Sequence, residues 1–335
     1  MNKIAKIAAF LVTGMTIISS CTNNDTPSSP YDKKLAEFPY GLLTDSIKQF
    51  PKDDNLYFRR AVMLNENNET QPALADFRKA WSLKKQEKYA LGISTLLIDS
   101  KPADAIPFLE DALKALPNST LLRLSLAHAY DAQQRTDDAL AVCRDILQHN
   151  PQQVDVMKMG ADLLEKKGQL KEAIALLEKG YALVPYDVQL NYMLALKYAE
   201  DKNGKVLTLC DSLIKADSAD RHAEPYYYKG IYYSNTGNPD KALAAFDMAI
   251  KTDINYLDGY IEKASLLFDR KQYNDAMKTL NLLLTIKPDF PDTYYWLAKC
   301  QQAQGLKDDA RINYLRAYGL DQSFTSAKDS ADKLK

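Results

Sequence analysis

The side chains in this sequence that could carry nucleophilic or metal chemistry are few and far apart. Three cysteines lie beyond residue 100, and no two of them have the short CxxC spacing of a zinc site: Cys143, Cys210 and Cys300. The three histidines are equally isolated: His128, His149 and His222. The GxSxG, HExxH, GxGxxG and Walker A motifs are absent. The sequence therefore argues against an enzyme, a metal site and a bound cofactor. Buried free thiols are the simplest interpretation of the three cysteines, with a disulfide as the alternative.

The fourth cysteine, Cys21, follows a segment of a different kind. Two lysines precede an apolar run over residues 7–18, which has the length of a signal-peptide core and is too short to span a bilayer. The run ends in Ile18-Ser19-Ser20-Cys21. These four residues resemble the bacterial lipobox, in which a branched apolar residue and two small residues precede a cysteine.

The lipobox resemblance implies a lipid anchor on Cys21. In that family the thiol receives a diacylglycerol, the signal peptide is cut off before the cysteine, and the new amine receives an acyl chain such as palmitate. Residues 1–20 are then a signal peptide, and the acyl chains together hold the protein on a membrane. Thr22 in place of an aspartate favours the outer membrane, and a single Asp25 in place of an acidic cluster favours its periplasmic face. A plain secretory signal with an incidental cysteine is the alternative.

The two ends of the mature chain predict a tether and two caps. The stretch from Thr22 to about Asp32 consists mainly of Asn, Thr, Ser, Pro and Asp, so we predict a flexible tether over residues 21–37. Residues 38–53 have apolar side chains at helical spacing and predict one leading helix that covers the open edge of the fold. Residues 325–335 predict a short polar helix that caps the other end, as repeat proteins require for solubility.

Between these ends the sequence repeats with a fixed period. Ala264 and Ala298 lie 34 residues apart, and so do Ala276 and Ala310. The series continues upstream through further alanines: Ala242, Ala173, Ala139, Ala105 and Ala73. A period in this range predicts stacked pairs of antiparallel helices, in which facing small residues allow close packing of the helix axes. Prolines end several second helices, and glycines stand in several turns.

This pattern resembles the tetratricopeptide repeat (TPR) family over about residues 54–324. The resemblance implies an all-α, right-handed superhelical solenoid of about eight TPR helix pairs. The eight units are 54–85, 86–119, 120–153, 154–187, 188–222, 223–256, 257–290 and 291–324. The irregular unit 188–222 lacks the usual alanine and a closing proline. Ordinary repeat drift explains it most simply, and a division of the solenoid into two lobes at this unit is the alternative.

The TPR resemblance also implies where partners bind. In that family the first helix of each pair lines a concave surface that takes extended peptides or helices. The matching positions here are Phe58, Tyr192, Tyr227, Ile261 and Tyr295, with Leu124, His128, Lys158 and Asp162 in the middle units. The alternative is that these side chains pack against neighbouring repeats. Some members bind a partner's terminal carboxylate through a Lys–Asn pair, and Asp162 in place of that asparagine would repel a carboxylate.

Two functions remain from these observations. A formal net charge of −1 gives no basis for binding nucleic acid. The resemblance implies a membrane-anchored scaffold or adaptor that holds another protein in the bacterial cell envelope. The second hypothesis is a glycan-capture outer-membrane lipoprotein of a nutrient importer. Such proteins also contain TPR helices but carry long insertions, and no insertion here exceeds a few residues.

Overall fold

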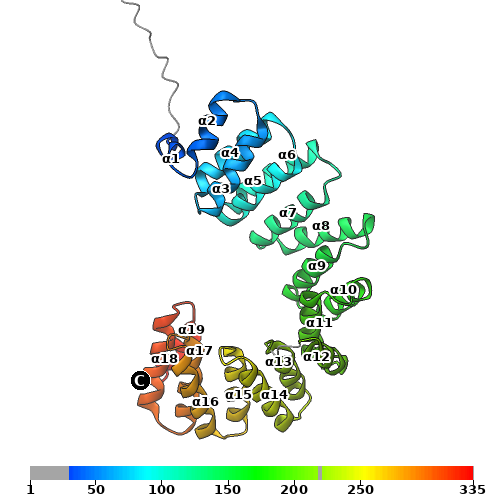
Figure 1. Ribbon diagram of the computed structural model, residues 1–335. Coiled ribbons are helices and arrows are strands. Elements are labelled where there is room, and N and C mark those ends of the chain that lie inside the picture. The colour runs from blue at the N-terminus through cyan, green and yellow to red at the C-terminus, as the bar shows by residue number, and fades with distance from the viewer. Residues whose placement is uncertain (1–29, 218–220, 335) are drawn as a thin grey trace, which may run out of the picture. The chain divides into compact units, whose positions relative to one another are not determined.

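The computed structural model describes residues 30–217 and 221–334, and within these ranges it contains nineteen helices and no strand (Figure 1). The predicted all-α solenoid of helix pairs is confirmed. The alanine period explains this result, because each small residue marks the place where two helices cross. None of the described helices is long and apolar enough to cross a bilayer.

Eight helix pairs follow one another along the chain. The first four are α3 (Asp54–Glu66) with α4 (Thr70–Leu83), α5 (Glu87–Ser100) with α6 (Pro102–Ala115), α7 (Thr120–Ala132) with α8 (Thr136–His149), and α9 (Val154–Lys166) with α10 (Leu170–Leu183). The last four are α11 (Val188–Glu200) with α12 (Lys205–Ala216), α13 (Glu224–Asn235) with α14 (Pro239–Thr252), α15 (Leu257–Asp269) with α16 (Tyr273–Ile286), and α17 (Pro291–Ala303) with α18 (Lys307–Leu320).

The described helices form two compact units, which divide between Ile93 and Ser94. The division falls within α5, three pairs before the irregular unit 188–222. That irregular pair is continuous with the next one, because α11 and α12 both pack against α13. First helices of successive pairs also contact one another: α11 contacts α13, and α15 contacts α17. The first helices from α11 to α17 therefore form a continuous face.

Small residues permit the close helix contacts. Ala264, Ala276, Ala298 and Ala310 are fully buried in one cluster. At Gly230 a Cβ atom would lie 2.4 Å from the ring of Phe246, so only glycine lets that ring rest on α13. The alanine and glycine positions of the repeat thus set how closely the two helices of a pair approach.

The turns inside seven of the eight pairs each place one residue in the left-handed region of backbone space. Glycine takes this place at Gly168, Gly237 and Gly305, with φ between 71° and 81°. Other pairs use Asn68, Gln134, Lys202 and Lys271, with φ between 58° and 61°. A side chain with a Cβ adopts this conformation at a cost, so these four turns carry local strain.

The N-terminal cap differs from the prediction. Residues 32–37 were expected in the tether and 38–53 in one leading helix, but the chain forms two short helices, α1 (Asp32–Ala36) and α2 (Gly41–Gln49). Leu35 is buried, and its carbonyl oxygen accepts a hydrogen bond from Thr44 Oγ1 at 2.5 Å. Packing of Leu35 therefore draws residues 32–37 into the fold. Residues 1–29, which include the predicted signal peptide, Cys21 and most of the tether, lie outside the described part of the chain.

The C-terminal end carries one further short helix, α19 (Thr325–Asp332). It buries Ala327 and Ala331 in the same cluster as the last two helix pairs. Its other residues are mostly exposed and polar. The helix therefore covers the apolar side of α18 and presents a polar surface outward.

Candidate binding groove

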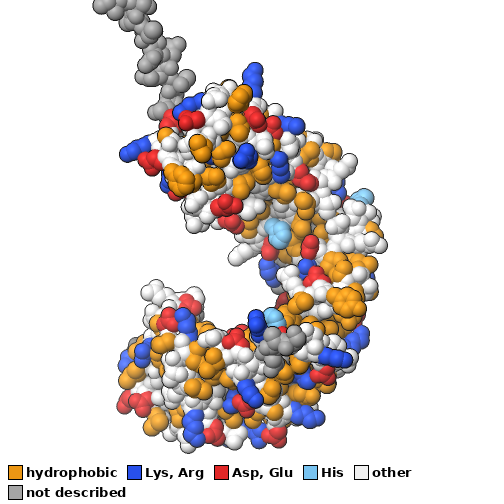
Figure 2. Space-filling model, in the orientation of Figure 1, with side chains coloured by type: hydrophobic (Ala, Val, Ile, Leu, Met, Phe, Trp, Pro, Cys, Tyr) orange, Lys and Arg blue, Asp and Glu red, His pale blue; other side chains and the backbone are white. Residues whose placement is uncertain are grey.

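A hollow of about 480 Å³ lies over the first helices of three successive pairs, α7, α9 and α11. Its walls combine apolar and charged side chains: Leu124, His128, Asp131, Asp155, Lys158, Met159, Asp162, Leu163, Glu165, Lys166 and Gln189. Figure 2 shows a histidine and charged side chains of both signs gathered over α7 and α9. The hollow is thus lined both by apolar side chains (Leu124, Met159 and Leu163) and by charged ones.

A second hollow of about 400 Å³ adjoins the first and shares His128 and Asp131 with it. Thr95, Ile98 and Asp99 of α5 line its other side. All of its lining residues belong to the unit that begins at Ser94. The two hollows together follow the first helices of four pairs, so we treat them as one groove.

Ion pairs neutralise most charges of the groove. Lys166 Nζ lies 2.7 Å from Asp131 Oδ1, and Lys158 Nζ lies 2.9 Å from Asp155 Oδ1. Lys158 also pairs with Asp187 at the start of α11, at 3.4 Å. Glu165 pairs with the buried Lys197 of α11. These contacts join successive first helices and fix the shape of the groove.

Asp162 differs from the other carboxylates of the first hollow. Among the described residues it has no ion pair and no hydrogen bond from a side chain. Desolvation raises the pKa of Asp162 above its ordinary value, and the neighbouring Glu165 carboxylate raises it further. Lys197 and Lys166 act in the opposite direction but more weakly than desolvation. The first hollow therefore holds one unpaired carboxylate, Asp162, which can accept a hydrogen bond from a ligand.

His128 also has no ion pair in the described chain. Desolvation lowers its pKa below the ordinary value, and Asp131 opposes this effect. Since the ordinary value is already below 7, the imidazole is neutral at neutral pH. His128 then offers both a donor and an acceptor to a bound segment.

Two further acidic side chains lie on first helices, Glu262 on α15 and Asp292 on α17. Desolvation raises the pKa of both, and Asp258 raises both further. Three carboxylates of second helices are instead paired with cations: Asp211 with Lys229 at 2.7 Å, Asp240 with Arg270 at 2.5 Å and Asp247 with Lys263 at 2.5 Å. The first-helix face therefore has unpaired acceptors at Glu262 and Asp292 as well as at Asp162.

The five groove candidates predicted from the sequence lie on first helices but do not line the hollows. Phe58 belongs to the first unit, where its ring centroid lies 5.2 Å from that of Tyr89. The other four are half-buried on α11, α13, α15 and α17: Tyr192, Tyr227, Ile261 and Tyr295. The rings of the three tyrosines pack on neighbours, as that of Tyr295 does on Phe324 at 4.8 Å. Their part in binding stays a prediction.

Leu124, His128, Lys158 and Asp162, predicted at the same repeat positions, do line the hollow. Sequence reasoning missed Asp131, Glu165, Lys166 and Gln189. A helical signal for two of them was present, because Asp131 and Glu165 each follow a predicted groove residue by three positions and lie 34 residues apart. The charge pairing across helices gave no such signal.

The cysteines lie away from the groove's chemistry. Cys143, Cys210 and Cys300 are free and buried. Burial raises the pKa of the Cys143 thiol to about 11, so it stays protonated and unreactive at neutral pH. No group of His, Cys, Asp and Glu side chains within residues 30–217 and 221–334 is arranged to hold a metal ion.

Tandem helix pairs with a groove along their first helices define an α-helical repeat scaffold. Comparison with known families gives the particular class. Residues 96–163 match the model of a tetratricopeptide repeat, and residues 264–305 match a TPR repeat model. The chain is a tetratricopeptide-repeat protein, as the 34-residue period predicted. Proteins with this fold are typically non-catalytic scaffolds that bind protein partners in a groove.

Solved structures with a similar fold share little sequence with the chain. A tetratricopeptide repeat protein from Parabacteroides merdae is 18% identical with a TM-score of 0.61, over 73% of this chain and 96% of that one. The APC/C hetero-tetramer Cut9–Hcn1 is 14% identical with a TM-score of 0.51, over 87% of this chain and 57% of that one. At such identities the likeness concerns the fold alone.

One curated relative is more similar in sequence. The Vi polysaccharide export protein VexE of Salmonella typhi is 27% identical over 222 residues, which is 64% of this chain and 33% of the relative. The chain thus spans about a third of the length of this relative.

Proposed function

We propose that this protein is a lipid-anchored TPR scaffold of the bacterial cell envelope, which holds a segment of another envelope protein in its groove. Lipid on Cys21 anchors it to the outer membrane, on the periplasmic face. The groove over α5, α7, α9 and α11 receives the partner. The protein acts by holding this partner near the membrane and performs no catalysis itself.

The observation that carries the proposal is the groove with its unpaired acceptors. Its ion pairs link successive first helices, so the groove is shaped before a partner arrives. Asp162 and His128 can form hydrogen bonds with a partner, and Leu124 and Met159 provide apolar contacts. Such a surface suits an extended segment with alternating polar and apolar side chains.

The membrane anchor is supported by the sequence of residues 7–21 alone. Changing Cys21 to Ser removes the thiol that would carry the diacylglycerol. We expect the variant to leave the membrane fraction, while the wild-type chain stays with the outer membrane on a density gradient. Retention of the Cys21→Ser variant in that fraction would exclude the lipid anchor.

The scaffold role is tested by affinity purification from cross-linked native envelopes. The bait is the full-length protein, compared with an Asp162→Ala/Gln189→Ala variant of the groove and an Asp240→Ala control near α14. We expect one envelope protein to be lost with the groove variant and kept with the control. A partner list unchanged by the groove variant would move the binding surface elsewhere.

Glycan capture in an outer-membrane nutrient importer is the second candidate function, and the similarity to a polysaccharide export protein is the observation in its favour. The helices follow one another through short connections in the described ranges, so the chain has no inserted glycan-binding domain there. Binding of the purified protein on a glycan array, lost with Asp162→Ala/Gln189→Ala, would favour this second function over the scaffold.

A further inference from the structure

The N-terminal cap exposes large apolar side chains in a short stretch. Phe38 is 96% exposed, Leu42 84% and Phe50 61%. Figure 2 shows hydrophobic side chains at the surface over the N-terminal helices α1 and α2. Single exposed apolar residues are common, but three within thirteen positions concentrate apolar surface in water. This surface has no partner within the described part of the chain.

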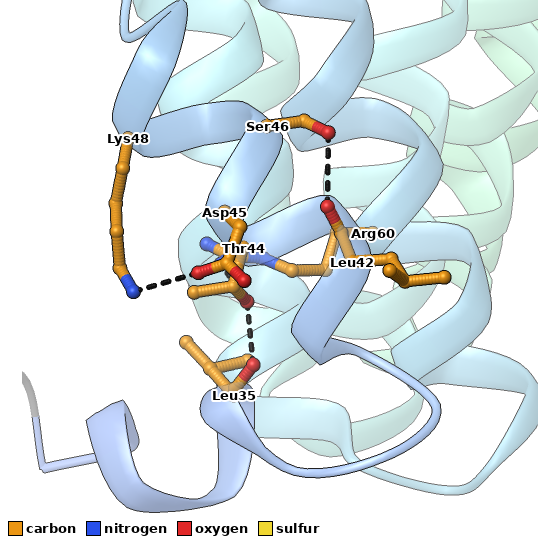
Figure 3. Close-up of polar contacts among 7 residues, drawn as sticks. All are labelled: Leu35, Leu42, Thr44, Asp45, Ser46, Lys48 and Arg60. Carbon is orange, nitrogen blue, oxygen red and sulfur yellow. Dashed lines mark hydrogen bonds and ion pairs between the residues drawn. The ribbon is translucent and has the colours of Figure 1, made fainter.

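The cap that carries these side chains is firmly built. Thr44 of α2 donates to the Leu35 carbonyl oxygen and accepts a hydrogen bond from Arg60 Nη1 at 2.8 Å (Figure 3). Ile47 of α2 is buried, whereas Leu42 on the same helix faces water. The exposed apolar surface is therefore presented by folded helices that already have a core of their own.

Charge does not explain what this surface binds. Residues 30–53 contain four lysines and four acidic residues. Lys48 pairs with Asp45 at 2.8 Å, and Lys34 pairs with Glu69. A surface with balanced charge and exposed Phe and Leu is suited to an environment that is apolar inside and polar at its border. The boundary between lipid headgroups and acyl chains has this character.

The position of the cap in the chain indicates that a membrane covers this apolar surface. Only residues 22–29 separate Cys21 from the first described residue, and eight residues span at most about 29 Å when fully extended. With lipid on Cys21, as proposed above, the cap cannot move farther than this from the bilayer. The short connection raises the effective concentration of membrane at the exposed side chains.

We propose that Phe38, Leu42 and Phe50 insert into the bilayer interface, so that the cap docks on the membrane that carries the lipid anchor. The inference rests on the proposed anchor and adds a second point of attachment to it. Docking is driven by burial of apolar surface and depends little on anionic lipid or on salt.

A fluorescent probe on the cap tests this proposal. Leu42→Cys and Phe50→Cys are introduced separately into the full-length lipoprotein and labelled with the environment-sensitive dye NBD. The native Cys143, Cys210 and Cys300 are buried and do not react. Tyr186→Cys, at a site that is 92% exposed in the other unit, is the matched control. The labelled proteins are placed in vesicles of phosphatidylethanolamine and phosphatidylglycerol, with and without brominated acyl chains.

We expect brominated lipid to quench NBD at positions 42 and 50 at least about twofold more than at position 186, since only the cap lies in the interface. Raising the salt to about 0.5 M screens exposed charges. We expect the difference to remain, because docking depends on burial of apolar surface. Equal quenching at positions 42 and 186 in protein that floats with the vesicles would overturn the docking proposal. Shielding of the NBD dye from water that appears without lipid and grows with protein concentration would show that a second copy of the chain covers this surface. That result would also overturn the docking proposal.

Failure of the anchor has a different signature. Without lipidation the wild-type protein does not float with vesicles, and its Cys21 thiol reacts with the dye. Docking is then tested on the unlipidated Cys21→Ser chain with a large excess of vesicles. Weak flotation that is lost with Leu42→Ser/Phe50→Ser, but not with Tyr186→Ser, would still support docking, and no flotation at all would overturn it.

Discussion

Arg60 of α3 and Asp76 of α4 form a buried, two-pronged ion pair. Arg60 Nε lies 2.6 Å from Asp76 Oδ2 and Nη2 lies 2.8 Å from Oδ1, and the two side chains are only 7% and 8% exposed. The third nitrogen of the guanidinium reaches Thr44 of α2. One side chain therefore fastens the N-terminal cap to the first helix pair (Figure 3).

Breaking this pair should destabilise the first unit. Arg60→Met leaves the Asp76 carboxylate buried without a cation, which costs about 3–5 kcal/mol of unfolding free energy. Urea unfolding of the purified chain measures the loss. The double variant Arg60→Met/Asp76→Leu should recover most of it, because neither charge remains. A loss below about 1 kcal/mol in the single variant would show that the pair contributes little.

The strained turns predict a stabilising change. Lys271 has φ of 59° at the position where other pairs have glycine, and its side chain is exposed. Lys271→Gly should raise the unfolding free energy by up to about 1 kcal/mol, since glycine adopts this backbone conformation without a steric penalty. Thermal unfolding measures the gain, and Lys271→Ala should show none. A lower melting temperature for the glycine variant would contradict the strain.

The unpaired Glu262 predicts a pH dependence of stability. Its folded-state pKa is raised by burial, so the folded chain favours the protonated acid. This contribution to stability is present at pH values below the unfolded pKa and is lost as the pH rises through the raised folded pKa. Glu262→Gln should therefore stabilise the protein at pH 7, and the gain should shrink toward pH 4. Urea unfolding at several pH values checks this, and a destabilised variant at pH 7 would mean that Glu262 has a cationic partner.

The repeat register predicts where a charge is not tolerated. Ala139 on α8 is fully buried, whereas Ala141 on the same helix is exposed. Ala139→Glu places an unpaired carboxylate at a helix crossing and should cost about 3 kcal/mol or more. Ala141→Glu, the matched control, should change stability by less than about 0.5 kcal/mol. Equal melting temperatures for the two variants would show that the register of the third pair is wrong.

The repeated part of the fold could be predicted because its information is local. Ala264 and Ala276 lie where two helices cross closely, and the same requirement for a small residue recurs in each pair. The 34-residue period makes this requirement visible in the sequence. The cap could not be predicted in the same way. Leu35 is one apolar residue in a polar stretch, and its burial depends on Thr44 and on Arg60, which lies 25 positions further along the chain.

The groove was predictable only in part. His128 and Asp162 follow from the repeat positions, but their electrostatics depend on contacts between pairs. The pairing of Glu165 with Lys197 joins residues 32 positions apart on different helices. It leaves Asp162 as the unpaired carboxylate of the first hollow, which spacing alone does not reveal. The lipid anchor at Cys21 stays a prediction from the sequence.

The central claim is that the first-helix face of the second unit holds a protein partner. Site-specific photo-crosslinking in living cells tests it most directly, with the photoreactive amino acid p-benzoylphenylalanine at Leu124 or Gln189 in the groove. The same amino acid at the exposed Leu183 of the second helix α10 is the control. The account predicts one cross-linked envelope protein from both groove positions and none from Leu183. Cross-links from Leu183 alone would place the partner on the opposite helices and contradict the account.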